Sequence, residues 1–392
     1  MRLLGRLSSF ALTVLFDCTA AVAFLLAYAG YNGEGSVPLN LDRAITLDPW
    51  NPDFLLRRGR PEDIEKAAAL TPRGSAAQIA LAMEAESNGD LSAALAHLRE
   101  AEKRDKTFAP LWAQANFHFR HGNWPEFWTA ARKGAHLYQG DLSALYRLCL
   151  RTQDKAEEVF SKVVPDRSAA VRQFLDVMGE DRRHAEAIAA VDKLARMARP
   201  QDREFLAAYC EQIRAAHPAL ALPLRNRLSE RGVIPYPPLD PAAGRVVTNG
   251  GFEREPTGTC FDWAVPRSHD LFTRMASGGG IRISLSGRQA DGTVLLSQAV
   301  PLEPGRRYRL SYKADLDELH PARCVHWKLG PIRSEPLDSS RGEWTFSVPP
   351  TVRNPVLELV ARRESGFTRA EGRLLMERVD IRPADNDLAA AR

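Results

Sequence analysis

Hydrophobic residues follow three successive patterns along the chain, and the first is an unbroken apolar run. It extends from Leu7 to Tyr31 and is long enough for a helix to cross the hydrocarbon core of a membrane. Arg2 and Arg6 precede the run, whereas Glu34 follows it. Because positive charges stay on the cytoplasmic side, we expect the rest of the chain to lie outside the cytoplasm.

Two interpretations of residues 1–33 remain open. The length of the apolar run favours a transmembrane signal-anchor that is not cleaved. The tripeptide Ala27-Tyr28-Ala29 instead has the small-x-small spacing of a signal-peptide cleavage site. Both interpretations export the remainder of the protein.

The second pattern is helical and starts near Ser75. Within it, Gly89 is followed at helical spacing by Ala94, Leu98 and Ala101. Small residues at this spacing let two helices approach closely, and the large residue fills the space between them. We therefore predict packed pairs of helices.

This spacing returns with a period of about 34 residues and resembles the tetratricopeptide repeat. Further matches run over 112–131 and 174–200, and two more helices are predicted over 201–216 and 219–231. The resemblance implies an α-helical solenoid over 39–232 that binds protein partners. The alternative is an array that only spaces the following domain from the membrane.

The third pattern is an alternation of apolar and polar residues. It follows a proline-rich linker, residues 233–245, that cannot continue a helix because proline lacks the backbone donor. About seven or eight short strands with turns between them are typical of an antiparallel β-sandwich. Strands are predicted over 280–285, 294–300, 308–314, 325–329, 344–348, 356–361 and 372–381. The predicted fold class is therefore multidomain, α followed by β.

Three segments of the β region resemble the galactose-binding-like jelly rolls, especially carbohydrate-binding modules. They are the opening Asn249-Gly250-Gly251-Phe252-Glu253, the middle segment 301–311 and the closing segment 372–381. The resemblance covers 246–383 and leaves 384–392 as a disordered tail. It implies a module that contacts glycan.

Sugar recognition requires exposed aromatic faces, on which the C–H faces of a pyranose stack. The candidates are Trp263, Trp327, Tyr312 and Phe272. Trp263 has the alternative of a core position beneath the first strands, and Trp344 is expected in the core.

The same resemblance implies a structural calcium ion held by Glu253 and Glu377, and no other cofactor. Arg378 follows Glu377 where the family commonly has a second acid, which places a cation beside the expected ion. The alternative is an ion pair between Glu253 and Arg378.

Five cysteines occur and none forms a C-x-x-C pair, which argues against a disulfide-rich scaffold or a cysteine-ligated zinc array. Because export favours oxidation, we expect a disulfide between Cys260 and Cys324. Cys149 and Cys210 lie in helical segments and are expected to be small buried hydrophobes.

Catalytic and nucleic-acid signatures were not found. None of the nucleotide-binding, zinc-protease or serine-hydrolase motifs occurs. His118 and His121 could share a metal, but exposed helix histidines explain this spacing better. The 53 basic residues balance 49 acidic ones to a net charge of +4, too even for a nucleic-acid-binding face.

The sequence thus predicts a non-catalytic envelope adaptor. It is expected in the bacterial inner membrane, single-pass, with its C-terminal bulk in the periplasm. Protein partners dock on the helical repeats, and the β domain contacts glycan or protein. The combined resemblance implies a role in exopolysaccharide or O-antigen assembly. The alternatives are a purely structural adaptor and a glycoside hydrolase acting through paired carboxylates.

Overall fold

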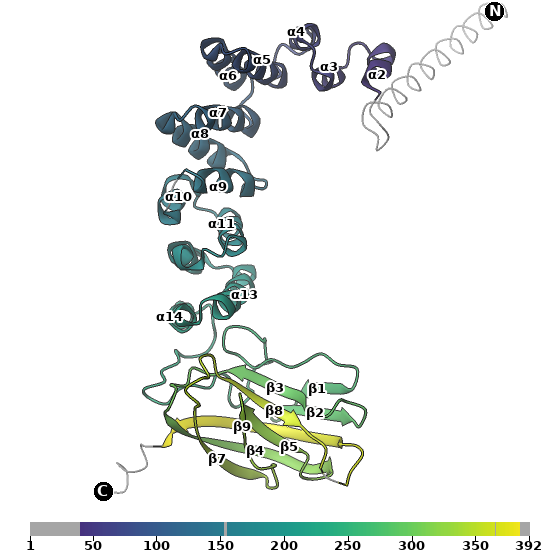
Figure 1. Cartoon of the computed structure of the whole chain (residues 1–392), viewed down its shortest axis with the longest axis vertical. Helices are drawn as coiled ribbons and strands as arrows, with labels where there is room; N and C mark the ends of the chain where they lie inside the picture. The colour runs from purple at the N-terminus through teal and green to yellow at the C-terminus, as the bar shows by residue number, and fades with distance from the viewer. Residues whose placement is uncertain (1–39, 153–154, 365, 385–392) are drawn as a thin grey trace, which may run out of the picture. The chain divides into compact units, whose positions relative to one another are not determined.

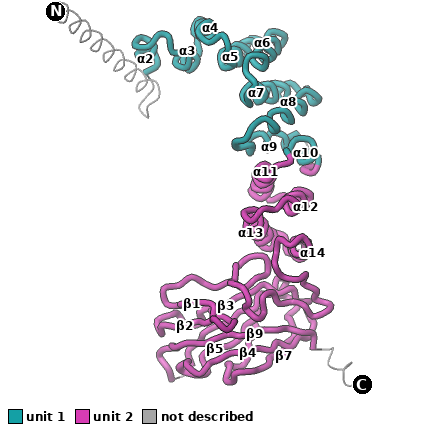
Figure 2. The backbone as a smooth tube through the Cα atoms, turned by 180° about the vertical axis from the view of Figure 1, so that it is seen from behind, with its two compact units in different colours: residues 1–154, 158–165 teal, residues 155–157, 166–392 magenta. Residues whose placement is uncertain are grey.

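The computed structural model of the chain describes residues 40–152, 155–364 and 366–384, and shows helices followed by antiparallel sheets (Figure 1). The order α then β is as predicted. The chain divides into two compact units (Figure 2). One comprises residues 1–154 and 158–165, and the other comprises 155–157 and 166–392.

The predicted membrane segment, residues 1–33, lies outside the described residues, as does most of the predicted tail 384–392. None of the helices in the described part of the chain combines the length and the apolar character that a membrane crossing needs.

The first unit consists of helices that pack in sequence order, α3 on α4, α5 on α6 and α7 on α8. These antiparallel pairs confirm the prediction of packed helix pairs. Their bounds are α2 (Leu41–Leu47), α3 (Pro52–Arg58), α4 (Pro61–Leu70), α5 (Ala76–Ser87), α6 (Leu91–Arg104), α7 (Phe108–Arg120), α8 (Trp124–Leu137) and α9 (Ser143–Leu150), with α10 (Ala156–Val163) divided between the two units.

Small residues let these helices approach closely. Ala94 and Ala101 on α6 and Ala115 on α7 have no exposed surface, while Leu98 fills the space between them. At Gly134 on α8, an added Cβ would lie 3.2 Å from the ring of Phe108 on α7. The spacing of small residues therefore sets how tightly each pair can close.

The helices of the second unit also pack as pairs, α11 with α12 and α13 with α14. The last pair agrees closely with the helices predicted over 201–216 and 219–231. The bounds are α11 (Ser168–Glu180), the short 3₁₀ helix η1 (His184–Ala187), α12 (Ile188–Met197), α13 (Pro200–Ala216) and α14 (Pro218–Glu230).

The rest of the second unit forms two antiparallel sheets, with strand order β1-β2-β9-β4-β7 in one and β3-β8-β5-β6 in the other. All seven predicted strands are present, and the sequence pattern missed β1 and β6. The bounds are β1 (Leu271–Met275), β2 (Ile281–Ser286), β3 (Thr293–Ala299), β4 (Arg307–His320), β5 (Val325–Leu329), β6 (Ile332–Arg333), β7 (Arg341–Ser347), β8 (Val356–Ala361) and β9 (Glu371–Pro383).

One hydrophobic core collects buried residues from both sheets. On β4 the buried residues alternate along the strand, from Tyr308 through Leu310 and Tyr312 to Ala314. This alternation places one face of the strand in the core, as the sequence pattern predicted.

The proline-rich segment 233–245 is bound to α14 by polar side chains. Arg225 donates to the carbonyl of Pro237, Asn226 donates to the carbonyl of Leu239 at 2.7 Å, and the Ser229 hydroxyl donates to the carbonyl of Tyr236. These bonds satisfy three backbone carbonyl groups of a segment that has no helical hydrogen bonds of its own. The boundary between the compact units accordingly lies near residue 165 and not in this segment.

The predicted disulfide between Cys260 and Cys324 is wrong. Cys260 is bonded to Cys210 on α13, with 5.5 Å between the Cα atoms, and Cys324 is a free, buried thiol. Burial raises the pKa of the Cys324 thiol to about 11. The expectation that Cys210 is only a small buried hydrophobe is therefore wrong, because spacing along a chain does not show which loop a helix face meets in the fold.

Candidate binding sites

Three of the four aromatic residues predicted to bind sugar lie in the core. Trp263 and Trp327 have no exposed surface, with 6.3 Å between their ring centroids, and Tyr312 is also buried. Their faces pack against protein and cannot stack on a pyranose, so this prediction is corrected. Trp327 points inward because strand alternation on β5 places it on the same face as Val325 and Leu329, which also belong to the core.

Phe272 on β1 is the exception, because 67% of its surface is exposed. It lines a shallow cavity of about 480 Å³ together with Arg267 and Arg274. This geometry leaves Phe272 available to a ligand.

Glu253 and Glu377 do not fit a calcium site. Glu377 lies at a bulge in β9, where Arg378 pairs with Lys313 and Met376 pairs with Ala314. Its carboxylate accepts a hydrogen bond from the Lys313 ammonium, so a cation already occupies it. No group of three metal-binding side chains occurs among the residues that the structure describes. We assign no metal here.

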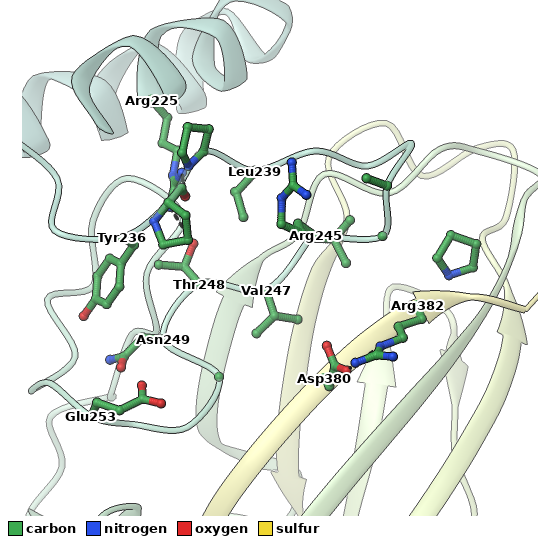
Figure 3. A pocket seen from close by; sticks show the side chains of 17 residues that line it. Arg225, Tyr236, Leu239, Arg245, Val247, Thr248, Asn249, Glu253, Asp380 and Arg382 are labelled. Atoms are coloured by element: carbon green, nitrogen blue, oxygen red, sulfur yellow. Dashed lines mark hydrogen bonds and ion pairs between the residues drawn. The ribbon is translucent and has the colours of Figure 1, made fainter. Parts of the chain in front are cut away.

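Glu253 instead lines the junction cavity, a space of about 620 Å³ within the second unit (Figure 3). We use this name for the cavity lined by Arg225 of α14, the proline-rich segment, the turn at 247–250 and the end of β9. Its polar lining comes from Arg225, Tyr236, Arg245, Asn249, Glu253, Asp380 and Arg382.

The turn beside this cavity depends on its sequence. Asn249 adopts a left-handed backbone conformation, and its side-chain amide donates to the carbonyl of Arg254 at 2.8 Å. The carbonyl of Gly250 accepts from Val379 on β9, and an added Cβ at Gly250 would collide with the Val379 carbonyl. The opening motif thus places Asn249 and Glu253 opposite β9.

Arg225 is the unusual residue of the junction cavity. Its side chain has no exposed surface, and the guanidinium donates to Pro237, Thr248 and Asn226, all neutral acceptors. Its Nε has no hydrogen-bond partner. Sequence reasoning missed this residue, since an arginine beside Leu224 is normally read as part of a solvated helix face.

Burial controls the charges around Arg225. Loss of hydration lowers the pKa of Arg225 to about 10. The charge of the Asp262 carboxylate has a smaller effect, which raises this pKa. Burial also raises the pKa of Asp262 and of Tyr236. Asp262 accepts hydrogen bonds from Thr257 and from the backbone of Trp263 rather than from the guanidinium.

The other two arginines of the junction cavity are paired with acids. Arg245 lies 3.1 Å from Asp240. Arg382 lies 2.8 Å from Asp380 on the same strand (Figure 3). Both arginine side chains are more than half exposed. The cavity therefore presents guanidinium and carboxylate groups together.

A second candidate site lies on the first unit. We call it the hairpin groove, and it consists of two cavities of about 430 and 470 Å³ that share Glu102 and Lys133. Residues of α6, α7 and α8 line it, including Leu95, Arg99, Glu102, Leu111, Gln114, His118, Glu126, Thr129, Lys133 and Leu137.

Two polar residues of α7 lie beneath the hairpin groove. Gln114 donates to the Glu102 carboxylate at 2.9 Å and to the carbonyl of Leu98. The bond to the carboxylate holds the pKa of Glu102 below its usual range. His118 is buried, its Nδ1 has no partner, and burial lowers its pKa. The expectation that His118 is an exposed helix histidine is therefore wrong. His121 contacts Glu86 at 2.8 Å instead of sharing a ligand with His118.

No protein-family model matches the sequence, and no curated protein is similar enough to match it. Solved structures give only low scores. PilF of Pseudomonas aeruginosa is 16% identical over 52% of this chain and 95% of its own, with a TM-score of 0.23. The anaphase-promoting-complex assembly Cut9–Hcn1 is 15% identical over 53% of this chain and 45% of its own, with a TM-score of 0.27. Scores this low do not establish a common fold, so none of these similarities shows what this chain does.

Proposed function

We propose that the protein is a non-catalytic adaptor that docks a protein partner in the hairpin groove and carries a second contact module in its β-sandwich. The observation that supports docking is the composition of the groove itself. Arg99 on α6 and Glu126 on α8 are both exposed, and neither takes part in an ion pair within the described part of the chain.

The charges of the hairpin groove specify the partner. An extended segment fits if it offers an acidic side chain toward Arg99 and a basic side chain toward Glu126. Between them, the half-buried side chain of Leu95 meets the apolar side chains of the segment. Charge complementarity of this kind mainly gives specificity.

The second part of the proposal concerns the β-sandwich. The strand order β1-β2-β9-β4-β7 in one sheet and β3-β8-β5-β6 in the other supports the proposal of a jelly roll similar to carbohydrate-binding modules. We accordingly propose that this module contacts glycan, and that the protein acts in polysaccharide assembly or export. The exposed Phe272 supports this proposal, whereas Trp263 and Trp327 are no longer part of it.

The proposed compartment is the periplasm, with residues 1–33 as the membrane anchor. The Cys210–Cys260 disulfide supports an oxidising compartment, because disulfides are rare in reducing cytosol. We propose no reaction for either candidate site.

The docking proposal is tested by photo-crosslinking in cells that produce the full chain. A photoreactive phenylalanine analogue replaces Thr129, which is exposed on α8 and lines the groove, or Ala96, which is exposed on α6 outside it. We expect one protein to crosslink at Thr129 and not at Ala96.

Charge reversal then tests the specificity of that crosslink. Arg99→Glu and Glu126→Lys should each reduce the crosslink by roughly tenfold. Lys66→Glu, an exposed change on α4, serves as the matched control and should leave it unchanged. Equal crosslinking at Thr129 and Ala96, or a crosslink that ignores both reversals, would refute docking in this groove.

A further inference from the structure

The junction cavity contains a buried cation whose charge is not balanced by a neighbouring acid. Arg225 has no exposed surface, its hydrogen bonds go to neutral oxygens, and its Nε is unpartnered. Buried charges in proteins are normally paired, because removing a charge from water without a counter-charge costs several kcal/mol. Arg225 therefore places a positive charge behind the wall of the cavity, and its field favours a negative group inside.

A simple anion does not fit the rest of the cavity. Glu253 and Asp380 also line it, and their carboxylates repel a free phosphate or an acetate. Carboxylates accept hydrogen bonds and attract a ligand that carries donors such as hydroxyl groups. The arginines of the lining therefore favour a ligand with one negative group, and its two carboxylates favour a ligand with several hydroxyl groups.

The remaining features agree with a sugar. Arg245 and Arg382 offer planar polar groups of the kind that bind two neighbouring hydroxyls, and Tyr236 supplies an aromatic ring at the cavity wall (Figure 3). The volume of about 620 Å³ lies within the range of small-molecule sites.

We propose that the junction cavity binds an acidic sugar unit, a uronic acid, with its carboxylate on the arginine side and its hydroxyls toward Glu253 and Asp380. This inference rests on the proposed glycan contact of the β-sandwich and moves that contact from the predicted tryptophans to the junction with α14. It does not depend on protein docking in the hairpin groove.

Titration calorimetry on the full chain tests the proposal with defined probes. Oligosaccharides of glucuronic acid are compared with glucose oligosaccharides of equal length, and inorganic phosphate is added as a competitor. We expect the acidic oligosaccharide to bind at least tenfold more tightly than the neutral one, with phosphate competing weakly.

Surface variants locate the binding site without disturbing the buried arginine. Arg382→Gln and Arg245→Gln change exposed side chains of the cavity, and each should weaken binding of the acidic oligosaccharide about tenfold. Ala243→Trp, at an exposed position of the lining, should block it. Arg274→Gln, beside Phe272 in a separate cavity of the β-sandwich, is the matched control and should bind normally.

The outcomes separate this inference from the proposed function. Glycan binding that ignores the cavity variants and is lost in Phe272→Ala would overturn the junction site but preserve the glycan contact. Absence of binding to every oligosaccharide would overturn both. Equal binding of acidic and neutral sugars, or full competition by phosphate, would overturn the assignment of a uronic acid.

Discussion

The sulfur of Cys210, on the buried face of α13, is bonded to that of Cys260, in the loop that precedes β1. The two residues are 50 positions apart, and the bond closes a loop that contains α14, the proline-rich segment and the opening motif of the β domain. The last helical hairpin and the β-sandwich are thus covalently joined within one compact unit. The disulfide and the hydrogen bonds from α14 thus hold the proline-rich linker at both ends of this junction.

Removing this bond should destabilise the second unit. For a closed loop of this length, we expect Cys210→Ser/Cys260→Ser to lower the free energy of unfolding by about 2–4 kcal/mol, because the unfolded chain regains conformational freedom. Urea unfolding with and without reductant measures the effect. Reductant should lower the midpoint of the natural chain and leave that of the double variant unchanged. A Cys260–Cys324 peptide in a non-reducing digest would contradict the pairing.

The tryptophans of the β-sandwich should act on stability and not on ligand binding. Trp327→Ala removes a fully buried ring and should cost about 3–5 kcal/mol, measured by urea unfolding. Phe272→Ala, the control, removes an exposed ring from the same unit and should leave the unfolding midpoint nearly unchanged. Similar losses in both variants would show that Trp327 is not a core residue.

The close approach of the helices in the first unit can be tested with one matched pair on α6. Ala101 is fully buried, so Ala101→Leu should overpack the helix pair and cost about 1–3 kcal/mol. Ala96→Leu makes the same change on the exposed face of the same helix. Thermal unfolding monitored by circular dichroism should separate the two variants. If both unfold like the natural chain, the small residues are not needed for packing.

The hydroxyl of Thr248 should contribute to stability through Arg225. It accepts a hydrogen bond from the guanidinium at 3.2 Å and is buried. Thr248→Val leaves a further donor of the buried arginine unsatisfied, at a cost of about 1–3 kcal/mol in urea unfolding. Thr345→Val, on the exposed face of β7, provides the control. Equal midpoints for the two variants would mean that this hydrogen bond does not contribute.

Acid should destabilise the β-sandwich through His326. Burial first, and then the charges of Arg362 and Lys328, lower the pKa of this imidazole, against a smaller opposite effect of Asp291. As the pH falls through the unfolded-state pKa of about 6.5, His326 takes up a proton in the unfolded chain before it does so in the folded chain. The folded state therefore loses stability as the pH falls. Between about pH 7.5 and about pH 5.5, the natural chain should lose more stability than His326→Gln. Parallel losses would exclude His326 as the cause.

Local pattern was sufficient for most of the elements. The period of small and apolar residues located α13 and α14 within one or two positions, and alternation located strands such as β5 and β8. These features depend on neighbours along the chain, because helix and strand periodicities repeat over a few residues. β6 was missed since two residues are too few to show alternation.

The sequence by itself determined the succession of helices and strands and which residues needed burial. Only the tertiary structure decided which buried residues meet. It paired Cys260 with Cys210, turned Trp263 and Trp327 into the core, and enclosed Arg225 beneath the proline-rich segment. The physical reason is that a pairing or a cavity depends on distances between segments far apart in the chain, which periodicity does not encode.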